Sequence, residues 1–126
     1  MSVDVYGNSG EETFFSNAGW AFVLNFAMEY GWHPAETMAP PNHKDWDGNY
    51  DAAEGQTISA SDAEALATAL SRGLDAPDRS ERSKEVAAKL THEVGASIDA
   101  FEFSPQSVEH WKNFINIARK GSFVIW

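Results

Sequence analysis

The chain has 126 residues, with 9 Lys and Arg against 19 Asp and Glu, 4 His and no cysteine. A chain of this length fits one domain over residues 1–126, large enough to form a core without disulfides. Its formal charge of −10 would repel phosphates, so we expect neither nucleic acid nor an anionic membrane as a partner. The absence of cysteine excludes disulfides, cysteine-ligated zinc, iron–sulfur clusters and a thiol nucleophile.

The acidity is regional. Residues 1–70 carry eleven acidic side chains and one basic side chain, whereas residues 71–126 carry eight of each. The densest acidic stretch is 36–64, where we expect any working surface to lie. The N-terminal residues lack the basic and apolar regions of a secretory signal, and the most apolar stretch is too short to span a bilayer. We therefore expect a soluble, cytoplasmic protein.

The N-terminal part of the chain predicts a strand, a turn and a buried helix. Residues 3–6 alternate between apolar and polar, which is typical of a half-buried strand, and residues 7–10 favour a turn. Ser16 or Asn17 can cap a helix that runs to about Tyr30, with Gly31 as the residue that stops it. This helix is apolar nearly all round, which indicates that it is the central element of the fold.

The middle of the chain predicts a long loop followed by a second helix. Residues 32–57 are rich in proline and glycine and show no helical period, and long loops of this kind are usually functional. Ser61 and Glu64 then form a capping box, since the hydroxyl and the carboxylate can each accept from a free backbone donor. The helix that they open ends near Gly73.

Two more helices and a strand complete the prediction. Apolar residues at four-residue spacing indicate a third helix that stops at Gly95. Ser104 and Pro105 predict the start of the fourth, which Gly121 ends, and residues 122–126 predict a strand. We expect a helix-rich α+β fold with about four helices and a small antiparallel sheet that includes the N-terminal and C-terminal strands.

An acidic segment of the long loop is the candidate metal site. Oxygen-bearing side chains at alternate positions resemble the first half of a calcium loop, where carboxylates converge on a hard cation. They are Asp45, Asp47, Asn49 and Asp51. The sixth position of such a loop needs glycine but holds Tyr50 here. Calcium is the one cofactor that the pattern indicates. The alternative is a solvated turn, because Asp and Asn beside Gly are ordinary turn formers.

Aromatic residues of the same loop are the candidate partner-binding residues. Trp and Tyr dominate the energetics of protein interfaces, and a loop rich in proline and glycine can present them. The candidate set is Trp32, Trp46, Tyr50 and Glu54. The alternative is that the aromatic rings fold back and cap the helical core.

No catalytic motif is present. The four histidines lack the spacing of zinc ligands, and no serine stands in a nucleophile elbow. Carboxylate pairs such as Glu11 and Glu12 arise by chance in a chain with 19 acids. We explain that pair by the dipole of the helix that follows. A small hydrolase stays open as an alternative that no motif supports.

Five short motifs follow one another along the chain. They are Gly31-Trp32-x-Pro34, Trp46-x-Gly48-x-Tyr50, Gly55-Gln56, Asp62-Ala63-x-x-Leu66-Ala67-x-Ala69-Leu70 and Gly121-x-Phe123-x-Ile125-Trp126. In this order they resemble a family of small uncharacterised bacterial proteins. The resemblance implies no established activity, cofactor or catalytic residue. It does imply that the Trp-x-Gly-x-Tyr loop and the helix after Gln56 belong to one unit.

The charge is the main guide to function. Complementary potentials raise association rates and select partners, so an acidic chain without a catalytic motif fits a protein-interaction module. We expect a non-catalytic protein of the inhibitor or immunity type that binds a basic protein surface. The alternatives are a ligand-binding or calcium-binding domain that uses residues 45–54, and the small hydrolase.

Overall fold

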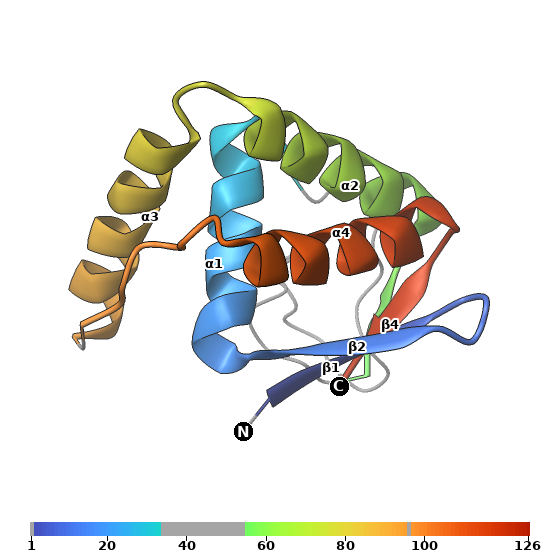
Figure 1. Ribbon diagram of the computed structural model, residues 1–126. Coiled ribbons are helices and arrows are strands. Elements are labelled where there is room, and N and C mark those ends of the chain that lie inside the picture. Colours follow the sequence, from blue (N-terminus) through green and yellow to red (C-terminus); the bar gives the residue numbers. More distant parts are fainter. Residues whose placement is uncertain (1, 34–54, 96) are drawn as a thin grey trace.

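The computed structural model describes residues 2–33, 55–95 and 97–126, and in these residues it has four helices and four strands. Figure 1 shows the helices packed together on one side of a small sheet, so the fold has two layers. All strand pairs are antiparallel. The expected helix-rich α+β fold is therefore confirmed.

The sheet has the strand order β2-β1-β4-β3. Its strands are β1 (Ser2–Gly7), β2 (Glu12–Ser16), β3 (Thr57–Ile58) and β4 (Phe123–Ile125). The two central strands are β1 and β4, in which Val5 lies opposite Ile125. The predicted pairing of the N-terminal and C-terminal strands is thus confirmed, whereas β2 and β3 are absent from the sequence-based prediction.

The acidic pair Glu11 and Glu12 lies in a β-hairpin. The Gly7 N–H donates to the Glu11 carbonyl oxygen at 2.7 Å, and Glu12 begins β2. No acidic residue stands in the first turn of α1 (Asn17–Glu29). The explanation of this pair by a helix dipole is therefore wrong, because a whole strand separates these charges from the helix.

The central helix is α1, as its apolar composition predicts. Ser16 caps it, since its Oγ accepts a hydrogen bond from the Gly19 N–H at 3.0 Å. Gly31 follows the helix with a φ of 97°, a conformation that glycine adopts without steric cost. In Figure 1, α1 lies between α3 (Arg79–Val94) and α4 (Pro105–Arg119). The buried side chains of α1 are Trp20, Phe22, Val23, Leu24, Phe26 and Ala27.

The second helix, α2 (Ala60–Asp75), begins earlier than predicted. Its N-cap is Ser59, whose Oγ accepts from the Asp62 N–H at 3.1 Å. The capping box expected from Ser61 and Glu64 is wrong, because β3 ends directly before Ser59 and this first serine takes the cap. Ser61 lies inside the first turn instead.

The remaining helix signals are confirmed. α3 ends at Gly95, which has a φ of 75°. The Ser104 Oγ caps α4 by accepting from the Ser107 N–H at 3.2 Å, and Pro105 is the first helical residue. The sequence thus predicts helix ends well where a capping side chain or a left-handed glycine marks them.

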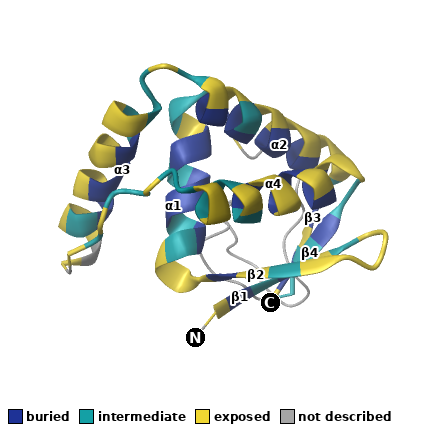
Figure 2. Ribbon diagram, viewed as in Figure 1, coloured by how far each residue is buried: buried dark blue, intermediate teal, exposed yellow. Residues whose placement is uncertain are grey.

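The core lies between the helices and one face of the sheet, and Figure 2 shows the buried positions on the helix sides that face inward. The ring of Phe15 lies 5.7 Å from that of Trp20, and the ring of Phe123 lies 5.4 Å from that of Phe114. Val5 of β1 faces the same side and is fully buried. The described helices cover this inner face only, so none of them lies on the opposite face of the sheet.

Candidate functional site

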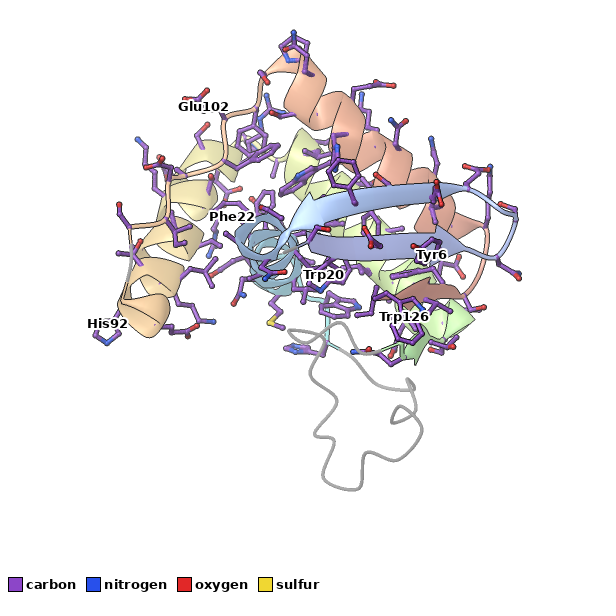
Figure 3. The ribbon with its side chains drawn as sticks, turned by 90° about the horizontal axis from the view of Figure 1, so that it is seen from below. Tyr6, Trp20, Phe22, His92, Glu102 and Trp126 are labelled. Atoms are coloured by element: carbon purple, nitrogen blue, oxygen red, sulfur yellow. The ribbon has the colours of Figure 1, made fainter. Side chains whose placement is uncertain are left out.

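The opposite face of the sheet carries three exposed aromatic residues. Because side chains alternate along a strand, the burial of Phe15 turns Phe14 to the other face, where it is 62% exposed. Tyr6 is 43% exposed and Trp126 is 59% exposed. Figure 3 views the molecule from this side and labels Tyr6 and Trp126. We call the following set the outer sheet face: Asp4, Tyr6, Glu12, Phe14, Val124 and Trp126.

The strand register places carboxylates between apolar side chains. Asp4 lies opposite Phe14 of β2. On the other side, its backbone exchanges two hydrogen bonds with Trp126, at 2.8 and 2.9 Å. Tyr6 lies between Glu12 of β2 and Val124 of β4. The outer sheet face therefore alternates negative and aromatic groups over adjacent strands.

Two carboxylates of this face have no basic partner among the described residues, although the Asp4 Oδ1 accepts a hydrogen bond from the Ser2 hydroxyl at 3.5 Å. Nearby Glu11 forms an ion pair with Lys120. Neither Asp4 nor Glu12 forms an ion pair with another residue of the described ranges. A carboxylate that stands beside an aromatic ring favours a cation, because the charge and the face of the ring both attract it.

A groove runs along β2 on the outer sheet face. It has a volume of about 420 Å³ and is lined by Asp4, Tyr6, Glu12, Thr13, Phe14 and His110. His110 projects from α4, and its ring lies 6.4 Å from that of Phe14 and 4.7 Å from that of Phe15. The groove therefore reaches from the face of the sheet to its β2 edge.

One predicted partner-binding residue, Trp32, lies in the core. It is 2% exposed, and its Nε1 donates to the Asp62 carbonyl oxygen at 3.3 Å. This position agrees with the alternative that the aromatic residues cap the helical core. The remaining candidates lie outside the described residues and stay predictions: Trp46, Tyr50 and Glu54 for a partner, and Asp45, Asp47, Asn49 and Asp51 for calcium.

A polar cluster ties α1 to α3. The Tyr30 hydroxyl donates to Asp78 at 2.9 Å, and Arg82 donates to Asp78 and Glu29 at 3.1 and 3.0 Å. Burial, the hydrogen bond to Asp78 and the negative charge of its carboxylate raise the pKa of Tyr30 to about 12. The hydrogen bonds from Arg82 and Tyr30 lower the pKa of Asp78. The polar groups of Tyr30, Asp78, Arg82 and Glu29 pair with one another, so we assign the cluster a structural role.

Two other hollows lie away from the outer sheet face. One, of about 520 Å³, lies beside α2 and includes Arg72, whose guanidinium donates to the Tyr30 carbonyl oxygen at 2.9 Å. The other, of about 310 Å³, is mainly apolar and is bounded by Phe101 and Trp111. In the described parts of the chain, no three His, Asp or Glu side chains are placed to hold a metal ion.

The aromatic residues of the outer sheet face are missing from the candidates that the sequence provides. Gly7–Gly10 predicts a turn, and the residues that follow it, Thr13-Phe14-Phe15, are strong strand formers. Together they indicate a hairpin, in which alternate residues must point away from the core. That pattern identifies Tyr6 and Phe14 as outward-facing aromatic residues.

Comparison of the chain with protein-family models, with curated proteins and with solved structures finds no significant match. The resemblance to a family of small bacterial proteins therefore stays a prediction. No helix in the described residues is long and apolar enough to cross a membrane.

Proposed function

We propose that this protein is a non-catalytic interaction domain of the inhibitor or immunity type, which binds a basic surface of another protein through the outer sheet face. The observation that carries the proposal is the alternation of Asp4 and Glu12 with Tyr6, Phe14 and Trp126 on one face of the sheet. The proposal agrees with a fold in which the described helices cover only the opposite face.

The aromatic residues supply the apolar part of such an interface. Single exposed apolar side chains are common on protein surfaces, but adjacent ones mark sites of interaction. Phe14 lies in β2, Tyr6 lies in β1, and Trp126 directly follows β4, so their side chains share one surface. Aromatic anchors of this kind contribute most of the binding energy in protein interfaces.

The carboxylates supply the selectivity. Asp4 and Glu12 require a partner with Lys or Arg at matching positions, because a buried carboxylate without a cation would cost binding energy. The net charge of −10 adds a long-range attraction for basic proteins. A neutral apolar surface would pack against the aromatic rings, but it would leave the Asp4 and Glu12 carboxylates without a cation.

The proposal is tested by capture with the whole chain as bait, followed by titration calorimetry with the purified captured protein. Glu12→Lys reverses one charge on the outer sheet face. Glu93→Lys is the matched control, since it makes the same change on exposed α3 and leaves the sheet untouched. We expect Glu12→Lys to weaken binding about tenfold, and Glu93→Lys to have a much smaller effect.

The dependence of the binding affinity on salt concentration is the second measurement. Because screening weakens interactions between exposed charges, the affinity for a basic partner should fall as the salt concentration rises. A partner that binds equally well at low and high salt, or that binds Glu12→Lys as tightly as the wild type, would overturn the proposal.

A further inference from the structure

We propose that the free edge of β2 adds an extended segment of the partner as a fifth strand of the sheet, and that this segment alternates basic with apolar residues. The inference rests on the proposed function and specifies how the outer sheet face recognises its partner. Three features carry it: the direction of the β2 backbone groups, the groove beside them and the charges around the groove.

The backbone of β2 presents unpaired groups to the edge. Asp4 exchanges backbone hydrogen bonds with Trp126, so its N–H and C=O point toward β4. Because these groups alternate along a strand, those of Val5 point toward β2, where Val5 lies opposite Thr13. It follows that Glu12 and Phe14, the neighbours of Thr13, point their N–H and C=O groups away from β1.

No strand of the described residues occupies that side of β2, which is the last strand of the sheet. In Figure 1, β2 lies at the front edge of the sheet, with α4 above it. An exposed edge of this kind is a template for an extended chain. The N–H and C=O groups of Glu12 and Phe14 offer such a chain two donors and two acceptors.

The groove predicts the side chains of the added strand. Every second residue of that strand would lie on the outer sheet face beside Glu12 and Phe14, where a guanidinium can pair with the carboxylate and stack on the ring. The intervening residues would point toward His110 and Thr13, on the side of the sheet that the helices cover. A basic–apolar alternation fits both sides.

Charge also determines which kind of chain can pair with the free edge of β2. A second copy of this chain paired through β2 would bring two Glu12 side chains, and two chains of net charge −10, onto one short edge. Like charges at that position disfavour a dimer. A segment that carries Arg or Lys removes the repulsion and pairs Asp4 and Glu12, so the geometry points to a basic segment of another protein.

The probe is a blocked six-residue peptide of alternating arginine and valine, added to the isotope-labelled whole chain and followed by amide hydrogen exchange and NMR. We expect the amides of Glu12 and Phe14 to exchange about tenfold more slowly with peptide than without. The amide of Thr13, which faces β1, is the internal control and should change little. The same peptide with glutamate in place of arginine should not bind.

Two variants distinguish the contribution of the Phe14 backbone N–H to peptide binding from that of the Phe14 ring. Phe14→Ala removes the ring, whereas Phe14→Pro removes the ring and the outward N–H, a change that an edge strand tolerates on its free side. We expect Phe14→Pro to bind the peptide about fivefold more weakly than Phe14→Ala. Circular dichroism shows whether each variant keeps the fold, and the exchange measurement on the wild type does not depend on either variant.

The outcomes distinguish this inference from the proposed function. If the peptide does not bind, or binds without slowing exchange at Glu12 and Phe14, strand addition is overturned. If a captured basic protein is then still sensitive to Glu12→Lys, the proposed function stands without it. Concentration-dependent dimerisation of the chain that competes with the peptide would also overturn the inference, because β2 would then pair with itself.

Discussion

Two adjacent phenylalanines allow a direct test of the outer sheet face. Phe15 is 5% exposed, and its ring lies 5.5 Å from that of Phe114, so Phe15→Ala would leave a cavity in the core. Such a substitution costs about 3–5 kcal/mol of unfolding free energy. Phe14 is 62% exposed, so Phe14→Ala gives up less than half of the roughly 3 kcal/mol that full burial of a phenylalanine side chain provides. We expect a loss of about 1 kcal/mol.

Urea denaturation of both variants, followed by tryptophan fluorescence, measures this difference in unfolding free energy. Phe14→Ala should instead weaken binding of the basic partner, which Phe15→Ala leaves largely intact in the folded fraction. Equal destabilisation by the two substitutions would refute the reasoning, since it would mean that Phe14 is as buried as Phe15. A stable Phe14→Ala variant with full partner affinity would remove Phe14 from the docking surface.

Three further predictions concern stability and metal binding. Because the pKa of Tyr30 is raised from 10.0 to about 12, its contribution to stability is present below pH 10 and is lost as the pH rises through about 12. Thermal unfolding from pH 9 to pH 12 should show this loss, and Tyr30→Phe should flatten that pH dependence. Ser59→Ala should cost about 1 kcal/mol in urea denaturation because Ser59 caps α2. Ser61→Ala should change stability by less than half as much; equal costs would contradict the assigned cap. The calcium hypothesis for residues 45–51 predicts binding heat and a higher melting temperature with calcium at millimolar concentration. A titration with neither heat nor a thermal shift would refute it.

The helices could be predicted from the sequence because their signals are local. Ser16 and Ser104 provide an oxygen for a free backbone N–H, and Gly95 adopts the left-handed conformation that ends α3. The apolar side chains on nearly all sides of α1 similarly indicate that it is the central helix of the fold. These features depend on a few adjacent residues, so tertiary contacts did not need to be known.

The sheet was harder to predict because its partners are distant along the chain. β3 has two residues and becomes a strand only by pairing with β4, which lies more than sixty residues later. β2 has a local signal in its run of strand formers, but the acidic pair at its start, Glu11 and Glu12, also fits the N-terminus of a helix. Without the hairpin, no local signal places Phe14 on an exposed face, whereas the aromatic residues of the segment 32–57 have the composition of interface anchors.

Trp32 illustrates a second limit. A tryptophan next to a segment rich in proline can be an interface anchor or a core residue, and composition does not separate the two. The outcome depends on whether its N–H finds an acceptor inside the protein, as it does at the Asp62 carbonyl oxygen. Distant backbone geometry therefore decides the role of this residue.

The pairing of β1 with β4 has a consequence for the order of folding. Val5 meets Ile125 across almost the whole length of the chain, and contacts of such high sequence separation form slowly because they close a large loop. During synthesis, the residues of β1 and β2 leave the ribosome long before those of β4. Until β4 is available, Val5 lacks its neighbour Ile125, and the side of β1 that β4 occupies is open to other nascent chains.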